Sequence, residues 1–436
     1  MTRLAQSKRN LLALRGRSFK SLLPHEARCV LRVGADLALG GRRWIGGQPL
    51  VFPEFGSQTL ETDDLALVDD LLSHPESWSD HSAEESFASE FCRWNGSAAA
   101  FGFMGGRVAL SACIDALGLV EGDEVIVPGY TCVVVPNAFA HAGINVRYCD
   151  IELDTYGPDF DSLRAAVSPT TRAVLVHHLY GLVCRDFERI LEFATDHKLR
   201  VIEDCAHSLG ATFMGRKVGN WGDAGFYSTE QSKVMSTFNG GMAVANTPAV
   251  IERLREYHRN SPYPDRERIR RLLRNVRYYF LLQKAPARWF MKGLWRYTYR
   301  RDILISTGEE ELRGELPPHY RERMPAPLAR LASSQLSKVD RFNLTRRRTA
   351  EKWQEHCVRL NLRTPKVIEG SVPVFLRYPV TVPTGRKYDT EWGLAQFGVL
   401  PGHWFTGELH PLRRIMPECP NARIAVECCL NLPTLI

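Results

Sequence analysis

Short apolar runs alternate with segments of helical periodicity through the middle of the chain. Between residues 106 and 117, apolar residues recur at the i, i+3, i+4, i+7 spacing of one helix face, so a helix is predicted to begin just after Gly105-Gly106. Strand-like runs lie at 124–128, 145–150, 172–178 and 200–206, and helical segments separate them at 133–143, 161–167 and 186–198. Strands separated by helices of this length predict an α/β fold, with a mainly parallel sheet covered by helices on both faces.

Four regions of different character follow one another along the chain. Residues 1–50 form a basic N-terminal extension, and residues 51–255 carry the alternating pattern and are predicted to be a large α/β domain. Residues 256–320 are interpreted as a basic, aromatic helical insertion. Residues 321–436 begin with a new helical pattern and include the strand-like YPVTV, so they are predicted to form a smaller C-terminal α+β domain.

Composition places the chain among ordinary soluble proteins. Apolar residues make up 44% of the 436 positions and charged residues 24%, so a large buried core is expected. The net charge of +7 is modest for this length and does not by itself indicate nucleic acid. The 11 cysteines show no CxxC and no paired metal-ligand spacing, which favours free thiols in a reducing compartment and no metal site. The absence of a long apolar run and of a secretory signal predicts a cytoplasmic protein.

The segment 265–301 combines 12 Lys and Arg residues with two acids and eight aromatic residues. One interpretation is that the aromatic side chains pack on the body of the protein while the arginines stay in solvent. The other is a basic, aromatic surface in peripheral contact with an anionic membrane at the inner membrane face. Nucleic acid is not an expected partner, because no base-reading module accompanies this segment.

A glycine pair and two polar residues fit the requirements of a phosphate site. Gly106 and Arg107 lie at the predicted start of a helix, where free amides and the helix dipole stabilise an anion and a guanidinium adds charge. Ser228 ends the strand-like GFYS and could donate a hydrogen bond to the same group. No dinucleotide or Walker-type phosphate motif occurs in the sequence.

A lysine, an aspartate and two histidines form the second group of candidates. Lys233 lies between GFYS and a glycine pair, where a partly dry site would lower its pKa and let the neutral amine form a Schiff base. Asp204 ends the apolar run RVIED, at the edge where open α/β sheets bind ligands, and could pair with a pyridinium nitrogen. His207 could contact the same ring, and His178 closes another strand at this edge. Taken singly, each of these residues is more often structural.

Together these motifs resemble the nucleotide-sugar aminotransferase family (DegT-like) of fold-type-I enzymes, which use pyridoxal 5'-phosphate (PLP). The likeness rests on GDEVIVPGYT, CDIELDTYG, VHHLYG, VIEDCAHSLGATFMGRKVGNWGD and FYSTEQSK…NGGMAV, and on RMPAPLARLASSQLSKVDRFN and CPNARIAVECCLNLP near the C-terminus. It covers about residues 55–255 and 322–434 and is strongest between Asp204 and Lys233, where order and spacing both agree.

The resemblance implies transfer of an amino group, typically from L-glutamate, to a nucleotide-linked keto sugar for glycan or polysaccharide biosynthesis. Lys233 would hold PLP covalently and then move protons, Asp204 would bind the pyridine nitrogen, and His207 would lie beside the cofactor. The residues implied to hold its phosphate are Gly106, Arg107 and Ser228. The resemblance also implies a homodimer with active sites at the subunit boundary.

Several positions depart from the family pattern. The family commonly has a small hydroxyl residue at Arg107, and an aromatic residue that stacks on the cofactor at Cys132, where Tyr130 is near but shifted. It often has an asparagine, offered to the neighbouring subunit, at the position of Arg321. We therefore name Tyr130, His178 and Arg321 as candidate substrate-binding residues.

Two further hypotheses stay open beside the sugar aminotransferase. The altered walls of the site are compatible with another fold-type-I PLP activity, such as sugar dehydration or transfer to a non-sugar ketone. Lys233 favours transfer, because related sugar dehydratases have histidine at that position. The third hypothesis is a non-catalytic scaffold that tethers a polysaccharide-assembly complex to a membrane through the basic insertion.

Overall fold

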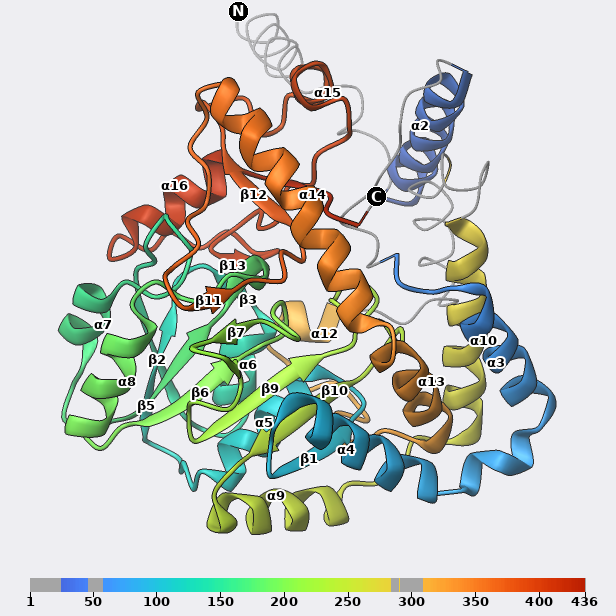
Figure 1. The fold of residues 1–436 in the computed structure, drawn as a ribbon, viewed down its shortest axis with the longest axis vertical. Coiled ribbons are helices and arrows are strands. Elements are labelled where there is room, and N and C mark those ends of the chain that lie inside the picture. Colours follow the sequence, from blue (N-terminus) through green and yellow to red (C-terminus); the bar gives the residue numbers. More distant parts are fainter. Residues whose placement is uncertain (1–24, 46–57, 284–289, 291–308, 436) are drawn as a thin grey trace, which may run out of the picture. The chain divides into compact units, whose positions relative to one another are not determined.

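The structure is a computed structural model that describes residues 25–45, 58–283, 290 and 309–435. The chain divides into two compact units, residues 1–48 with 281–304 and residues 49–280 with 305–436. The described part of the N-terminal extension is one helix, α2 (His25–Ile45), which belongs to the first unit. The second unit contains the sheet and every element of the candidate site (Figure 1). The division of the sequence into four regions stays a prediction.

A seven-stranded sheet forms the centre of the second unit. Across the sheet, the strands are β1 (Ala99–Phe103), β10 (Gly241–Ala245), β9 (Ala224–Ser228), β6 (Arg200–Asp204), β5 (Thr171–His177), β2 (Glu124–Pro128) and β4 (Asn145–Cys149). In this sheet only β10 runs antiparallel to its neighbours, so the other strands share one direction. The mainly parallel sheet is confirmed, and the carboxyl ends of these strands meet at one edge.

Helices cover both faces of the sheet, as the alternating pattern predicts. On one face, α5 (Gly106–Ala116), α6 (Val134–Ala140) and α9 (Pro248–Asn260) enclose a core that includes Phe226 of β9. The next residue of β9, Tyr227, points to the other face, where its ring lies 5.3 Å from Phe91 of α4 (Ser82–Asn95). The helix α8 (Phe187–Asp196) packs against β6, and α7 (Phe160–Ala166) packs against β4 (Figure 1).

A short 3-10 helix separates two helices that precede the sheet. The helix α3 (Thr62–Ser73) ends before Pro75, which begins η3 (Pro75–Ser79) ahead of α4. Proline lacks an N–H group and its ring clashes with the preceding turn, so it separates the two helices.

The C-terminal part of the chain packs against the body and returns to the sheet edge. The helices are α13 (Ala326–Leu336), α14 (Val339–Arg359), α15 (Thr390–Phe397) and α16 (Pro420–Cys428). The predicted YPVTV strand is β12 (Tyr378–Thr381), which pairs with β14 (Cys429–Leu432). A separate three-stranded sheet joins β11 (Ser371–Val372) to β7 (Thr212–Phe213) and β8 (Arg216–Lys217). The strand β13 (Leu409–His410) pairs with β3 (Thr131–Cys132) and so brings the C-terminal segment beside the carboxyl ends of the large sheet.

The described part of the basic insertion is mainly the helix α10 (Arg266–Leu282). Its aromatic residues Tyr279 and Phe280 are buried, whereas Arg274 and Arg277 are exposed. This distribution agrees with the first interpretation of the segment, in which apolar side chains face the body. Membrane contact stays a prediction, because most of residues 283–301 lie outside the described residues. Among the described helices, none has the length and apolar character needed to cross a bilayer.

Candidate active site

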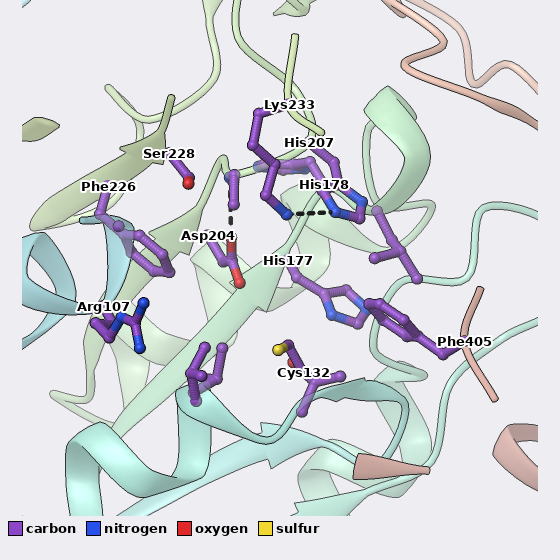
Figure 2. Close-up of a pocket in the computed structure, with 16 residues that line it drawn as sticks. Arg107, Cys132, His177, His178, Asp204, His207, Phe226, Ser228, Lys233 and Phe405 are labelled. Atoms are coloured by element: carbon purple, nitrogen blue, oxygen red, sulfur yellow. Dashed lines mark hydrogen bonds between the residues drawn. The ribbon is translucent and has the colours of Figure 1, made fainter. Parts of the chain in front are cut away.

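The predicted site residues converge at the carboxyl edge of the large sheet. Asp204 is the last residue of β6, Ser228 is the last residue of β9, and Gly106 is the first residue of α5, which follows β1. They line one pocket together with Lys233 and His207 (Figure 2). The other residues that line it are Arg107, Thr131, Cys132, Val134, Val135, His177, His178, Leu179, Ala206, Phe226 and Phe405.

Lys233, which is partly buried, and the buried His207 form a pair in this pocket. The Lys233 Nζ lies 3.0 Å from the His207 Nε2 (Figure 2). The other ring nitrogen, Nδ1, accepts a hydrogen bond from the backbone N–H of Tyr180 at 3.3 Å. A neutral imidazole that accepts at Nδ1 carries its proton at Nε2, so His207 donates to a neutral amine.

Burial favours the neutral forms of both groups. It lowers the pKa of Lys233, and the positive charge of Arg377 acts in the same direction, while Glu230, Cys132 and Asp204 act against it. Burial also lowers the pKa of His207 to well below its usual value, with further contributions from the cationic neighbours. A neutral lysine amine is a nucleophile, so the lowered pKa of Lys233 favours its reactive form.

Asp204 places a carboxylate on the floor of the same pocket. Its Oδ1 accepts a hydrogen bond from the backbone N–H of Ala206 at 2.9 Å. Burial raises the pKa of this carboxyl above its ordinary value, and the Ala206 amide and Lys233 oppose that shift. A carboxylate held in so dry a place is stabilised by a cationic partner, and a protonated ring nitrogen is such a partner.

Close contacts shape the end of the pocket at the start of α5. A Cβ atom added to Gly106 would lie 2.8 Å from the Cβ of Ser228, and one added to Gly241 would lie 2.6 Å from the Gly106 nitrogen. Only glycine fits at both positions, which leaves the first amides of α5 open to a ligand. Arg107 lines the pocket beside them and forms an ion pair with Glu311 of α12 (Glu309–Leu312).

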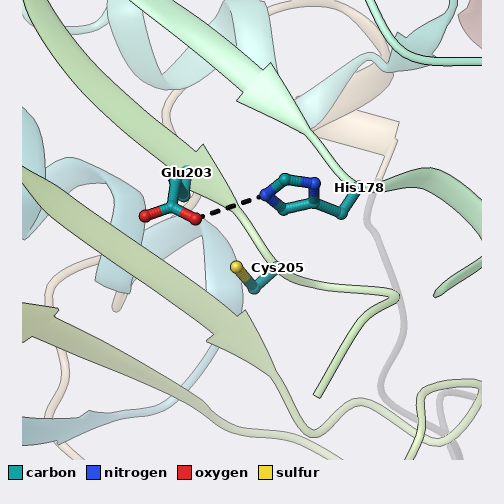
Figure 3. Close-up of side chains that lie close together, drawn as sticks. All are labelled: His178, Glu203 and Cys205. Carbon is teal, nitrogen blue, oxygen red and sulfur yellow. Dashed lines mark hydrogen bonds and ion pairs between the residues drawn. The ribbon is translucent and has the colours of Figure 1, made fainter. Parts of the chain in front are cut away.

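The two histidines of VHHLYG have different roles in the structure. His177 donates from Nε2 to the carbonyl of Tyr156 at 2.7 Å, and its buried Nδ1 has no hydrogen-bond partner among the described residues. His178 borders the pocket, but its Nε2 lies 3.3 Å from Glu203 and its Nδ1 accepts from the Cys184 amide (Figure 3). The histidine with an atom left for a ligand is therefore His177, which the sequence did not distinguish from its neighbour.

His178, Glu203 and Cys205 come close enough together, within the described residues, to be considered as a metal site (Figure 3). The Glu203 carboxylate, however, already accepts hydrogen bonds from the backbone amides of Gly219, Trp221 and Gly222, at 2.6 to 2.7 Å. With His178 as a further donor, its lone pairs are used, so the cluster is explained as a buried hydrogen-bond network.

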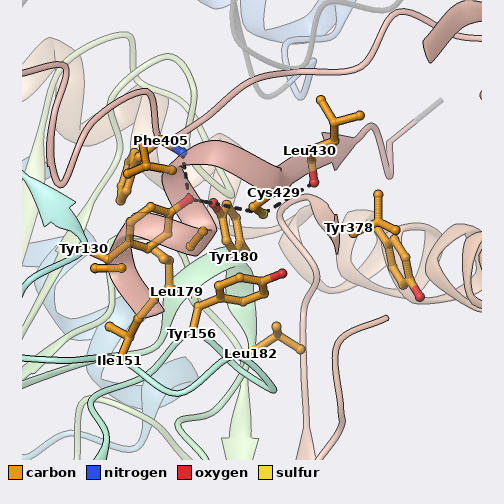
Figure 4. Close-up of a cluster of buried hydrophobic side chains, with 14 of the residues drawn as sticks. Tyr130, Ile151, Tyr156, Leu179, Tyr180, Leu182, Tyr378, Phe405, Cys429 and Leu430 are labelled. Carbon is orange, nitrogen blue, oxygen red and sulfur yellow. Dashed lines mark hydrogen bonds between the residues drawn. The ribbon is translucent and has the colours of Figure 1, made fainter. Parts of the chain in front are cut away.

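The structure places two predicted substrate-binding residues away from the pocket. Tyr130 is fully buried, and its hydroxyl lies 3.0 Å from that of Tyr180 (Figure 4). Arg321 lies over the ring of Tyr257, at 5.8 Å from its centroid. Cys132 does line the pocket, and the side chains of Phe226 and of Phe405, which comes from the C-terminal segment, border the same cavity. No local pattern in the sequence indicated Phe405, because its position depends on the pairing of β13 with β3.

These residues fit PLP group by group. The Asp204 carboxylate suits the ring nitrogen, the neutral Lys233 amine suits the aldehyde, and the glycine-lined start of α5 suits the phosphate. The unpartnered Nδ1 of His177 adds one more buried polar atom that a ligand can satisfy. A sheet of this topology with this site at its carboxyl edge defines a fold-type-I PLP-dependent enzyme.

The chain belongs to the DegT/DnrJ/EryC1/StrS aminotransferase family, whose model matches residues 58–434. It is 33% identical over 272 residues to an L-glutamine:2-deoxy-scyllo-inosose aminotransferase of Streptomyces kanamyceticus, with 62% of this chain and 55% of that protein covered. It is 28% identical over 344 residues to a UDP-N-acetyl-3-dehydro-alpha-D-glucosamine 3-aminotransferase of Acidithiobacillus ferrooxidans, with 78% and 80% covered. The match thus spans little more than half the length of the first relative and four fifths of the second.

Solved structures share the fold. An aminotransferase from Psychrobacter cryohalolentis superposes with a TM-score of 0.66 at 23% identity, covering 86% of this chain and 93% of that one. The E. coli GDP-4-keto-6-deoxy-D-mannose-3-dehydratase, whose structure holds hydrated PLP, gives 0.66 at 18% identity, with 89% and 96% covered. Aminotransferases and a dehydratase are both among these neighbours, so the fold alone does not separate the two reactions.

Proposed function

We propose that this protein is a PLP-dependent aminotransferase that moves an amino group onto the ketone of a sugar-like ring. The observation that carries the proposal is that the Lys233 amine, whose pKa burial lowers, lies in one pocket with the Asp204 carboxylate. A lysine amine supports transfer, because it can both bond to the cofactor and relay protons at a carbon centre.

Each residue of the pocket then has a defined task. When bound, PLP supplies an electron sink for the electrons of the bond that breaks. The Asp204 carboxylate holds the ring nitrogen in its protonated form, and the first amides of α5 with Ser228 bind the phosphate. The Lys233 Nζ accepts and returns the proton at the reacting carbon, and the His207 Nε2–H orients that amine. The depressed pKa of Lys233 suits this work near neutral pH.

A nucleotide-linked keto sugar is the acceptor we propose first. The supporting observations are relatives named for UDP-linked and GDP-linked sugars, a 3-aminotransferase of Acidithiobacillus ferrooxidans and a GDP-perosamine synthase of Caulobacter vibrioides. L-glutamate is the proposed amino donor. The amino sugar formed would serve glycan or polysaccharide biosynthesis.

A keto cyclitol with L-glutamine as donor is the second candidate. The observation that favours it is the 33% identity to the aminotransferase named for L-glutamine and 2-deoxy-scyllo-inosose. Both candidate acceptors would present a ring ketone and several hydroxyl groups to the same pocket. They differ in the diphosphate and nucleoside, which only the first carries.

The spectrum of the purified protein tests the proposal. Wild-type protein mixed with PLP is expected to gain the yellow absorbance of the bound cofactor, and Lys233→Ala is expected to lose it together with more than about a thousandfold of the transfer rate. Lys352→Ala, an exposed lysine of α14, serves as the matched control. A Lys233→Ala variant with unchanged absorbance would show that the amine does not hold the cofactor.

Substrate panels separate the two candidates. L-glutamate and L-glutamine are added one at a time, and the donor is the one that bleaches the yellow absorbance. The aminated enzyme then receives UDP-linked, GDP-linked and TDP-linked keto sugars and a scyllo-inosose, with return of the absorbance as the readout. Return with the inosose alone selects the cyclitol.

We further propose a homodimer in which Arg321 faces the neighbouring subunit. The residue is exposed, lies outside its own pocket, and occupies the position at which the family often offers a residue to its partner. Light scattering tests the dimer.

Co-sedimentation with anionic and neutral vesicles tests the proposed peripheral membrane contact through residues 265–301. Equal recovery with both vesicle types would remove the membrane proposal.

A further inference from the structure

Arg377 is a fully buried arginine close to the reactive amine. It lies immediately before β12 and is 1% exposed. Its guanidinium carbon is 3.5 Å from the centroid of the Trp404 ring, which is a close cation–π contact. Removing a guanidinium from water has a high desolvation free energy, which favourable contacts must offset. The close contact between the guanidinium and the indole restrains both side chains.

Trp404 connects this arginine to the catalytic pair. The Lys233 Nζ lies 5.7 Å from the centroid of the Trp404 ring. The indole and the His207 imidazole are nearly parallel, with 14° between their planes and 6.2 Å between their centroids. Arg377, Trp404 and the Lys233–His207 pair therefore follow one another through contacts between neighbouring groups.

The backbone around Trp404 is held by buried polar groups. The Tyr180 hydroxyl donates to the Trp404 carbonyl at 2.8 Å, and the Phe405 amide donates to the Tyr130 hydroxyl at 3.1 Å (Figure 4). The Lys387 Nζ donates to the Phe405 carbonyl at 2.7 Å. Tyr130, a residue we expected to bind substrate, thus supports the wall of the pocket through Phe405.

We propose that Arg377 is a positioning residue that fixes the Trp404 indole beside Lys233, so that this stack shields the amine from water. The inference rests on the proposed role of Lys233 as the cofactor-binding amine. It extends that role by assigning the C-terminal segment a direct effect on the reactive group.

Electrostatics agrees with this placement. The positive charge of Arg377 contributes to the lowered pKa of both Lys233 and His207. The other charged and titratable groups around the amine come from several elements, and they are Arg107, Cys132, His177, His178, Asp204, His207, Glu230 and His410. Glu230, Cys132 and Asp204 favour the ammonium form, so the buried arginine offsets part of their effect.

The test measures how readily Lys233 takes up PLP as the pH changes. Full-length protein is mixed with PLP between pH 5 and pH 10 and trapped with borohydride, and labelling of Lys233 is quantified by peptide mass spectrometry. Arg377→Met is expected to move the labelling midpoint to higher pH by roughly half a unit or more, because the ammonium form loses a repelling charge. Arg377→Lys, which keeps the charge, is expected to stay near the wild-type midpoint.

A matched control and a second variant make the test decisive. Arg386 also lies over an indole, that of Trp392, at the longer distance of 5.9 Å from the ring centroid. It is half exposed and does not line the pocket, so Arg386→Met is expected to leave the midpoint unchanged. Trp404→Leu keeps the arginine but admits water, and is expected to shift the midpoint to higher pH. It decides the question where Arg377→Met does not fold.

The outcomes separate this inference from the proposed function. A wild-type midpoint in Arg377→Met, or in Trp404→Leu, overturns the role of the stack while Lys233 remains the labelled residue. A wild-type protein that is not labelled at Lys233 overturns the cofactor-binding role itself, and this inference with it.

Discussion

Glu203 and Asp204 are adjacent acids on β6, yet the structure gives them opposite tasks. Successive side chains of a strand point to opposite faces, so Asp204 faces the pocket and Glu203 faces the protein interior. Glu203 is fully buried and accepts hydrogen bonds from three backbone amides and from His178. The sequence predicted acidic residues at the end of this strand. The alternation of successive side chains between the two faces of the sheet decided which of the two can contact a ligand.

A substitution at Glu203 is expected to reduce stability more than a surface change. Glu203→Gln removes the charge that accepts the amide hydrogen bonds and directs an NH₂ group at donors, so it should lower the free energy of unfolding by about 2–4 kcal/mol. Glu188→Gln, on the exposed side of α8, is the control and should change it by less than about 0.5 kcal/mol. Urea unfolding followed by circular dichroism measures both, and equal stabilities would contradict the assigned network.

Among the elements, the start of α5 shows how a local pattern and a tertiary contact combine. The helical spacing of residues 106–117 predicted the helix, with a start one residue later than the Gly106 at which α5 begins. The need for glycine at Gly106 comes from elsewhere, because Ser228 of β9 and Gly241 of β10 approach the same backbone. Neighbouring strands of the sheet, which are distant in sequence, bring them there.

Alanine at the two glycines of this element should have different effects. In Gly106→Ala the new Cβ would lie 2.8 Å from the Ser228 Cβ, so the cradle must widen and PLP affinity is expected to fall at least about tenfold. In Gly105→Ala the nearest atom would be Arg107 Nε at 3.6 Å, an ordinary contact, so affinity should change little. Absorbance titration with PLP compares them, and equal loss in both variants would argue against the steric origin.

Across the whole molecule, one buried and one partly buried histidine couple folding to pH. Burial lowers the pKa of His177 and of His258 to about 4 in the folded protein. His177 ends β5, and the His258 Nε2–H donates to the carbonyl of Gly102 at 3.1 Å. With a pKa of about 4, both rings are neutral near pH 7. In the unfolded chain these two histidines take up protons near pH 6.5. Their contribution to the free energy of unfolding is therefore fully present above that pH and is lost as the pH falls toward 4.

The free energy of unfolding is therefore expected to fall between pH 7 and pH 5 in the protein without added cofactor. Each histidine should contribute about 2 kcal/mol to this loss. His258→Gln retains a donor for the Gly102 carbonyl but cannot titrate. Between pH 7 and pH 5, its free energy of unfolding should therefore fall by about 2 kcal/mol less than that of the wild-type protein. Urea unfolding at the two pH values provides the measurement, and parallel declines in both proteins would refute the contribution of His258.

The sequence by itself determined the alternation of strands and helices, the mainly parallel sheet, and the order of the residues that line the pocket. These features follow from local periodicity, from the glycines before α5, and from the rule that parallel strands end at one edge. The resemblance to a family of known enzymes added the cofactor and the role of Lys233.

Tertiary structure alone decided the rest. It distinguished His177 from His178, placed Tyr130 in the core, and brought Arg377, Trp404 and Phe405 to the reactive amine. Lys233 and Trp404, for example, are 171 positions apart in the chain, and no local pattern encodes which side chains will meet when separate segments pack together.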